Sequence, residues 1–182
     1  MQHATIDPHV RSVTVTAPPP CAEPVSDAEE LARRALEIGY RAALGVLGSR
    51  EAAEDVAQDV AIKALRHAGA LRHPDAWLYR VATRAALREA RRTSARRRRE
   101  RELHDRDPAP AAADPSPSQA ILPLLDGLPT RQRAALTLRY VFDLSDDAIA
   151  AAMGCRAATV RAHLFQGRAA LRARLADEGG HT

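Results

Sequence analysis

The sequence predicts an all-helical protein in which a flexible linker joins two small helical domains. Residues of strong helix propensity, above all Ala, Leu, Arg and Glu, are abundant in the 182-residue chain. No alternating run of β-branched residues stands out, and apolar residues instead recur at helical spacing. Aromatic residues make up only 3% of the chain, so its cores must be built from Leu, Val, Ile and Ala.

The first domain is expected to begin after a polar, proline-rich arm at residues 1–25, which we interpret as disordered. Ser26 and Glu29 form a capping box, so a first helix should start there and end at Gly48. Its buried stripe is expected to contain Leu31, Ile38 and Ala42.

Two further helices complete this domain, which we place at residues 26–101. The second helix should begin at Ser49 and run to about His67, with a buried stripe of Val56, Val60, Ala64 and Leu65. Pro74 then interrupts the chain, and Asp75 is expected to cap a third helix that continues into the arginine-rich stretch 91–101.

Residues 102–118 are expected to form the linker, because they are rich in Pro, Ala and Asp and lack apolar periodicity. The second domain, residues 119–176, should hold four helices at about 119–127, 130–141, 145–154 and 156–175, followed by a flexible tail at 177–182. Ser145 is the expected cap of the third of these helices, and Gly154 its end.

The last two helices carry a helix-turn-helix pattern. Ala150 and Gly154 fit the small contact and the turn, and Val160 and Leu164 fit the core beneath an arginine-rich helix. The formal net charge is +4, and the basic residues cluster. This clustering favours a polyanionic partner over a small substrate.

The second helix presents an acidic strip on one face. Its members are spaced i, i+3, i+4 and i+7, and they are Asp55, Gln58, Asp59 and Ile62. Two carboxylates one turn apart can hold a metal, but no histidine at ligand spacing and no glycine-rich loop accompanies them. The strip is therefore either a solvated face or a docking surface for a basic partner.

The third helix shows the opposite charge. Arg80, Arg84 and Arg88 recur at every fourth position, although like charges at that spacing repel. Bound phosphates explain such a run better than chance, and nearby Trp77 and Tyr79 suit unstacked bases. A compositional bias towards arginine, and a core role for the tryptophan, are the alternative explanations.

These blocks resemble a known family. The stretch 53–60 (AEDVAQDV), followed by 77–83 (WLYRVAT), resembles region two of bacterial sigma factors of the extracytoplasmic-function (ECF) group, and the helix-turn-helix half resembles region four. Together the two resemblances cover about 26–98 and 119–176. They imply a cytoplasmic, non-enzymatic sigma factor that directs transcription initiation and needs no metal or cofactor.

The resemblance also assigns partners and residues. The acidic strip would dock on the β′ clamp coiled coil of core RNA polymerase, whose β subunit is a further contact. The promoter −10 element would be bound by the "−10 set": Arg72, His73, Asp75, Trp77, Tyr79, Arg80, Thr83, Arg84 and Arg88. The −35 element would be read by the "−35 set": Arg156, Thr159, Arg161, His163, Gln166 and Arg168. An anti-sigma protein is a further candidate partner.

The chain departs from the family pattern at several positions. Ala148 stands where the family usually has Glu, Arg156 where it has Ser, and His163 and Gln166 where it has Arg; Ala61 replaces a large aromatic residue. These departures leave open a degenerate member that binds polymerase without reading −35 DNA.

Two other functions compete with the sigma factor. One is a stand-alone helix-turn-helix regulator that binds a palindromic site as a dimer. The other is a metal-dependent nuclease that uses Asp55 and Asp59. No apolar run approaches the ~20 residues of a membrane span, so membrane insertion is not expected.

Overall fold

The computed structural model describes residues 27–103, 122–125 and 127–179. Within these ranges the chain is helical and contains no strand, which confirms the all-helical fold class. The N-terminal half consists of α1 (Asp27–Leu47), α2 (Arg50–Arg66), the 3-10 turn η1 (Ala68–Ala70) and α3 (Pro74–Leu103). The C-terminal half consists of α4 (Leu122–Leu125), α5 (Thr130–Tyr140), α6 (Asp146–Met153) and α7 (Ala157–Gly179).

Some expectations fall outside these ranges. The N-terminal arm, the cap at Ser26 and the linker from residue 104 onward are not among the described residues. The helix expected at 119–127 is described only over Leu122–Leu125, and α7 continues past its expected end to Gly179.

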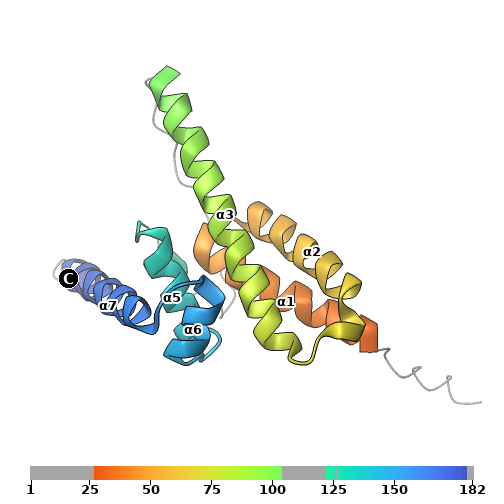
Figure 1. Cartoon of the computed structure of the whole chain (residues 1–182). Helices are drawn as coiled ribbons and strands as arrows, with labels where there is room; N and C mark the ends of the chain where they lie inside the picture. The colour runs from red at the N-terminus through yellow and green to blue at the C-terminus, as the bar shows by residue number, and fades with distance from the viewer. Residues whose placement is uncertain (1–26, 104–121, 126, 180–182) are drawn as a thin grey trace, which may run out of the picture.

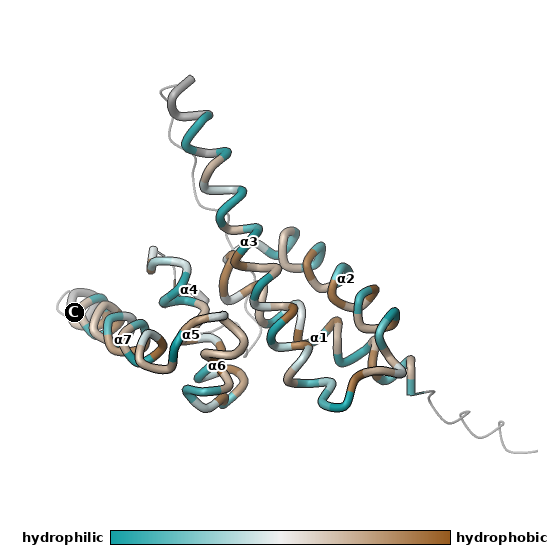
Figure 2. Tube along the Cα trace, in the orientation of Figure 1, coloured by the Kyte–Doolittle hydropathy of each residue, from teal (hydrophilic) through white to brown (hydrophobic). Residues whose placement is uncertain are grey.

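The helices of the N-terminal half form a bundle against which the C-terminal half packs. α1 lies along both α2 and α3, and the C-terminal part of α3 extends beyond the bundle (Figure 1). This extension is largely hydrophilic (Figure 2). α5 and α6 lie between the bundle and α7, which is outermost. Buried residues of the two halves join in one hydrophobic core.

The sharp turn between α1 and α2 is formed by the two residues expected to end one helix and cap the next. Gly48 adopts a left-handed φ of 69°, and its N–H donates to the Leu44 carbonyl at 2.8 Å. The Ser49 hydroxyl then accepts from the N–H of Ala52 at 3.4 Å and caps α2. Glycine ends one helix and serine starts the next, so both predicted boundaries are confirmed.

Two local expectations were wrong. Asp75 does not cap α3, because the helix begins one residue earlier at Pro74, where the missing N–H and fixed φ of proline suit the first helical position. Asp75 instead pairs with Arg34 of α1. Leu65 is 46% exposed rather than buried, because it lies about 100° around the helix from Ala64, which faces the core.

The start of α6 offers a direct test of its cap. The Ser145 hydroxyl accepts from the N–H of Ala148 at 3.3 Å. Ser145→Ala is therefore expected to lower the free energy of unfolding by about 1 kcal/mol, measured by urea denaturation followed by circular dichroism. Ser145→Thr keeps the hydroxyl and serves as the control. An equal loss in both variants would show that the hydroxyl does not cap the helix.

Candidate nucleic-acid interface

The acidic strip lines an open groove on α2. All four of its side chains are exposed, and together with Ala52, Val56 and Glu89 they enclose about 350 Å³. Ile62 is 49% exposed within this acidic surface, and Asp59 lies 3.7 Å from Lys63. An apolar residue surrounded by carboxylates can bind a basic helix that also presents an apolar side chain.

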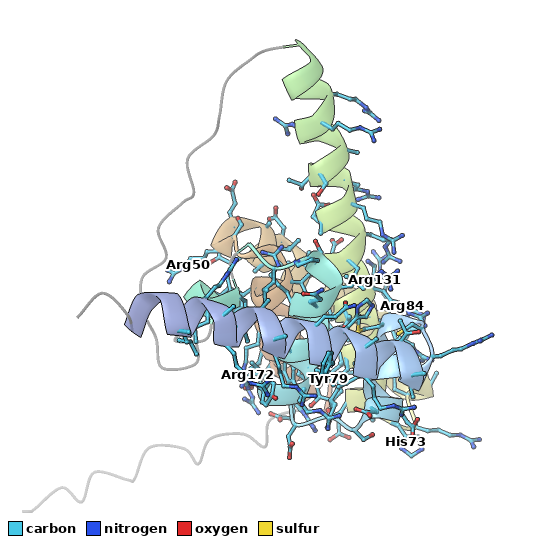
Figure 3. All side chains as sticks on the ribbon, turned by 90° about the vertical axis from the view of Figure 1, so that its left-hand side faces the viewer. Arg50, His73, Tyr79, Arg84, Arg131 and Arg172 are labelled. Atoms are coloured by element: carbon cyan, nitrogen blue, oxygen red, sulfur yellow. The ribbon has the colours of Figure 1, made fainter. Side chains whose placement is uncertain are left out.

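The segment that leads into α3 and the start of that helix carry the first members of the −10 set. Arg72 and His73 are exposed just before the helix, and His73 projects at the lower end of the molecule (Figure 3). Trp77 is half-buried, with its ring centroid 5.6 Å from that of His67. The ion pair between Asp75 and Arg34 ties the start of α3 to α1.

All three arginines of the basic stripe of α3, Arg80, Arg84 and Arg88, are exposed. Arg84 also donates to the carbonyl oxygens of Ala151 at 3.2 Å and Ala152 at 3.4 Å, near the end of α6. Its guanidinium therefore bonds to the C-terminal half while the side chain stays open to solvent.

Two other members of the −10 set are also turned towards protein. The Tyr79 ring meets Phe142 edge-on, with centroids 5.0 Å apart. Burial, and secondarily the charge of Asp75, raise the pKa of the Tyr79 hydroxyl. Thr83, which we expected beside the basic stripe, is only 1% exposed. The sequence correctly assigned Thr83 to this helix, but the side chain faces the core and not the solvent.

The recognition helix predicted from the helix-turn-helix pattern is α7. Five members of the −35 set are exposed along it: Arg156, just before the helix, and Thr159, Arg161, Gln166 and Arg168. Val160 and Leu164 are buried beneath them, as expected. Gly167 allows close packing on α5, because a Cβ at this position would lie 2.9 Å from the Leu136 Cδ1 atom.

The remaining member of the −35 set, His163, lies half-buried at a wide groove. This groove of about 610 Å³ is formed by α3, α7 and the start of α5. Burial, and then the charge of Arg131, lower the pKa of His163. The imidazole is thereby favoured in its neutral form, whereas an arginine at this position would carry a permanent charge.

Two contacts orient other side chains of α7. Asp146 lies 3.7 Å from Arg161 and also pairs with Arg139 of α5. The Gln132 amide donates to the Gln166 side-chain oxygen at 3.3 Å. Arg161 is thus positioned by α6 and Gln166 by α5.

One exposed aromatic residue of α7 was missed in the sequence. Phe165 is 69% exposed and lies one turn after Arg161, on the same side of the helix. The sequence could have indicated this exposed residue, because Phe165 lies four residues after Arg161 and three before Arg168. A large apolar residue between arginines is not expected on a helix face that only contacts solvent.

Two family models match the chain in sequence order. Residues 27–97 match the model of Sigma-70 region 2, and residues 118–171 match that of Sigma-70, region 4. The chain belongs to the sigma-70 family.

One curated relative of the chain is similar to it over most of its sequence. The chain is 33% identical over 165 residues to the ECF RNA polymerase sigma factor SigE of Mycolicibacterium smegmatis. The match covers 85% of this chain and 63% of the relative, so the chain spans less than two thirds of that protein.

A solved structure shares the sigma-70 fold of the chain. It is the sigma factor RpoE from Bartonella quintana, crystallised in complex with the anti-sigma factor NepR. The TM-score is 0.64 at 23% identity, and the match covers 82% of this chain and 96% of that one. The similarity extends over both halves and supports the two-part helical architecture.

The departures from the sigma-70 pattern have visible consequences at the helix starts. Ser145 caps α6, but Ala148 has no carboxylate to return the second bond of a capping box. At α7 the Arg156 carbonyl accepts from the N–H groups of Thr159 and Val160 at 2.9 and 3.1 Å. Its guanidinium cannot accept a hydrogen bond, so it cannot replace a serine cap.

Two kinds of feature are absent from the part of the chain that the structure describes. No group of three or more His, Cys, Asp or Glu in them is arranged to hold a metal ion. None of the helices in the same ranges combines the length and apolar character needed to cross a bilayer.

Proposed function

We propose that this protein is an alternative sigma factor of the ECF group, which binds core RNA polymerase and directs it to promoters. The observation that carries this proposal is an acidic groove on one half of a sigma-70 chain and an exposed row of arginines on the other half. The acidic groove lies on α2 of the N-terminal half, and the arginines of α7 are exposed on the C-terminal half.

In this proposal each surface has one task. The acidic strip binds the basic clamp coiled coil of the β′ subunit, and the β subunit contacts other parts of the chain. The −10 set holds unstacked bases of one strand, which stabilises the melted duplex. The −35 set enters the major groove, where Arg161 and Arg168 are suited to guanine. The chain needs no catalytic residue for this role. A protein that works with the polymerase is expected in the cytoplasm.

Run-off transcription tests the proposal. Core RNA polymerase is mixed with a library of promoter fragments in the presence or absence of the full-length protein. We expect transcripts with defined start sites only when the protein is present, because core polymerase alone cannot select promoters. Footprints on two equivalent half-sites without polymerase, and no new start sites, would instead favour the stand-alone regulator.

A further inference from the structure

The wide groove that His163 borders combines hydrogen-bond donors with apolar side chains. It encloses about 610 Å³ between α3 on one side and the start of α5 with α7 on the other. No carboxylate is among the described residues that line it. Its guanidinium and hydroxyl donors are Arg91, Ser94, Arg98, Thr130 and Arg131. A concave site of this size is typical for a small molecule, and these donors favour an anion.

The α3 wall of the wide groove is one stripe that changes from apolar to basic along the helix. Its residues recur in steps of mostly three and four, so they share one face: Leu87, Ala90, Arg91, Ser94, Ala95 and Arg98. Leu87 and Ala90 are buried, whereas Arg91 and Arg98 are exposed. A ligand that lies along this wall therefore meets an apolar end and a cationic end.

The opposite wall adds a cation from the other half of the chain. Arg131 is in the first turn of α5 and lies between α3 and α7 (Figure 3). No side chain caps the start of α5, so the helix dipole adds to the attraction for an anion there. The Gln132 amide donates to Gln166 of α7 at 3.3 Å, which joins these two helices into one wall.

Two of the guanidiniums have no carboxylate partner. Neither Arg91 nor Arg131 takes part in an ion pair within the described ranges, although the neighbouring Arg92 pairs with Glu89 at 3.7 Å. The buried Nε2 atom of His163 likewise has no hydrogen-bond partner in that part of the chain. Guanidiniums on facing walls repel one another, and an anion between them would replace this repulsion by attraction to both halves.

We propose that the wide groove binds a nucleoside polyphosphate, whose phosphates lie among Arg91, Arg98 and Arg131 and whose base lies against the apolar end of the α3 wall. Arginine matches phosphate oxygens with two parallel hydrogen bonds, and these three guanidiniums come from both halves. The flat ring of a base fits against Leu87 and Ala90, where it loses contact with water. Duplex DNA does not offer this combination, because its bases are stacked inside the helix.

Occupation of the groove would also affect DNA recognition, a consequence that rests on the proposed function. His163 and Gln166 belong to the −35 set and line the wide groove as well. A nucleotide beside them competes with promoter DNA, and the coupling is reciprocal, because DNA must weaken nucleotide binding by the same factor. The nucleotide concentration would thus set the fraction of the protein that is free to read the −35 element.

The first test measures binding to the full chain without polymerase. The probe is GTP that carries a fluorescent N-methylanthraniloyl label. We expect saturable binding that unlabelled GTP displaces at least about 10-fold more effectively than tripolyphosphate, which lacks the base. Equal displacement by both compounds would show that only phosphates are held and would overturn the nucleotide assignment. A signal that does not saturate would refute the site itself.

Substitutions in each half locate the bound nucleotide. Arg91→Ala and Arg131→Ala should each weaken binding of labelled GTP about 10-fold, because each removes a charge-assisted hydrogen bond. Arg92→Ala is the matched control, since Arg92 is on the same helix but does not line the groove. Circular dichroism checks that all three variants are folded. Equal losses in all three would indicate non-specific attraction to a basic helix, and a loss in Arg91→Ala alone would place the ligand outside the groove.

The second test measures competition with DNA. Fluorescence anisotropy follows binding of a random-sequence duplex pool to the full chain, with tripolyphosphate at equal concentration as the ionic control. GTP is expected to weaken duplex binding at least about 5-fold beyond this control, and Arg91→Ala/Arg131→Ala should abolish the difference. An unchanged duplex affinity at saturating GTP would refute competition. Failure in run-off transcription, despite GTP binding, would refute the sigma function and leave the nucleotide site intact.

Discussion

Replacing Asp55 and Asp59 with alanine is expected to weaken binding of core RNA polymerase by about 30-fold or more. Both carboxylates line the groove on α2 and are exposed in the free protein, so their charges are available to a basic partner. Docking removes water from the groove, and truncating one member of a desolvated charge pair costs about 2–5 kcal/mol. Each 1.4 kcal/mol is about tenfold in affinity, so the loss is readily measurable.

Fluorescence polarisation of labelled full-length protein, titrated with core enzyme, gives this affinity. The fold should survive the change, because the Asp59–Lys63 pair is exposed and such pairs contribute little to stability. Glu54→Ala is the matched control, since this exposed carboxylate is on the same helix but does not line the groove. Equal affinities for the double variant and the control would place the polymerase-binding surface elsewhere.

Leu136→Ala is expected to lower the free energy of unfolding by about 2–5 kcal/mol. The Leu136 side chain is fully buried in α5, and its Cδ1 lies where a side chain on Gly167 of α7 would be. The substitution therefore leaves a cavity under the recognition helix. Urea denaturation of the full chain measures the loss, and binding of promoter duplex by the same variant should fall because α7 loses its support.

Leu175→Ala provides the comparison for this effect. It removes the same atoms from the same half of the chain, but Leu175 is 50% exposed, so its loss should stay within about 0.5 kcal/mol. If the two variants unfolded at the same urea concentration, Leu136 would not support the helix-turn-helix.

The helix boundaries could be predicted from the sequence because their causes are local. Gly48, Ser49, Ser145 and Gly154 act on backbone groups within four residues of themselves, and their residue types are specific to helix ends. Asp75 shows where this reasoning fails. Its side chain was a plausible cap, but Arg34, which is 41 residues away in sequence, is its partner in the folded chain.

The candidate site was predictable only in part. Helical spacing correctly placed the acidic strip on one exposed face of α2 and most of the −35 set on the surface of α7. It could not show that Arg84 bonds to α6 or that Tyr79 meets Phe142, because these contacts join segments more than 60 residues apart. No periodicity within one helix contains that information.

Gly45 of α1 faces Thr137 of α5 where the two halves meet, and a Cβ on this glycine would lie 2.3 Å from the threonine Oγ1. This close approach has a genetic consequence. The codons of glycine and alanine differ at a single base, and the added methyl group is the smallest side chain that a mutation can supply. Because that methyl group would overlap the threonine side chain, one point mutation is enough to disturb the meeting of the two halves. The packing of the two halves is therefore sensitive to a change at one position, even though contacts of α1 and α3 with α5 and α6 also hold it.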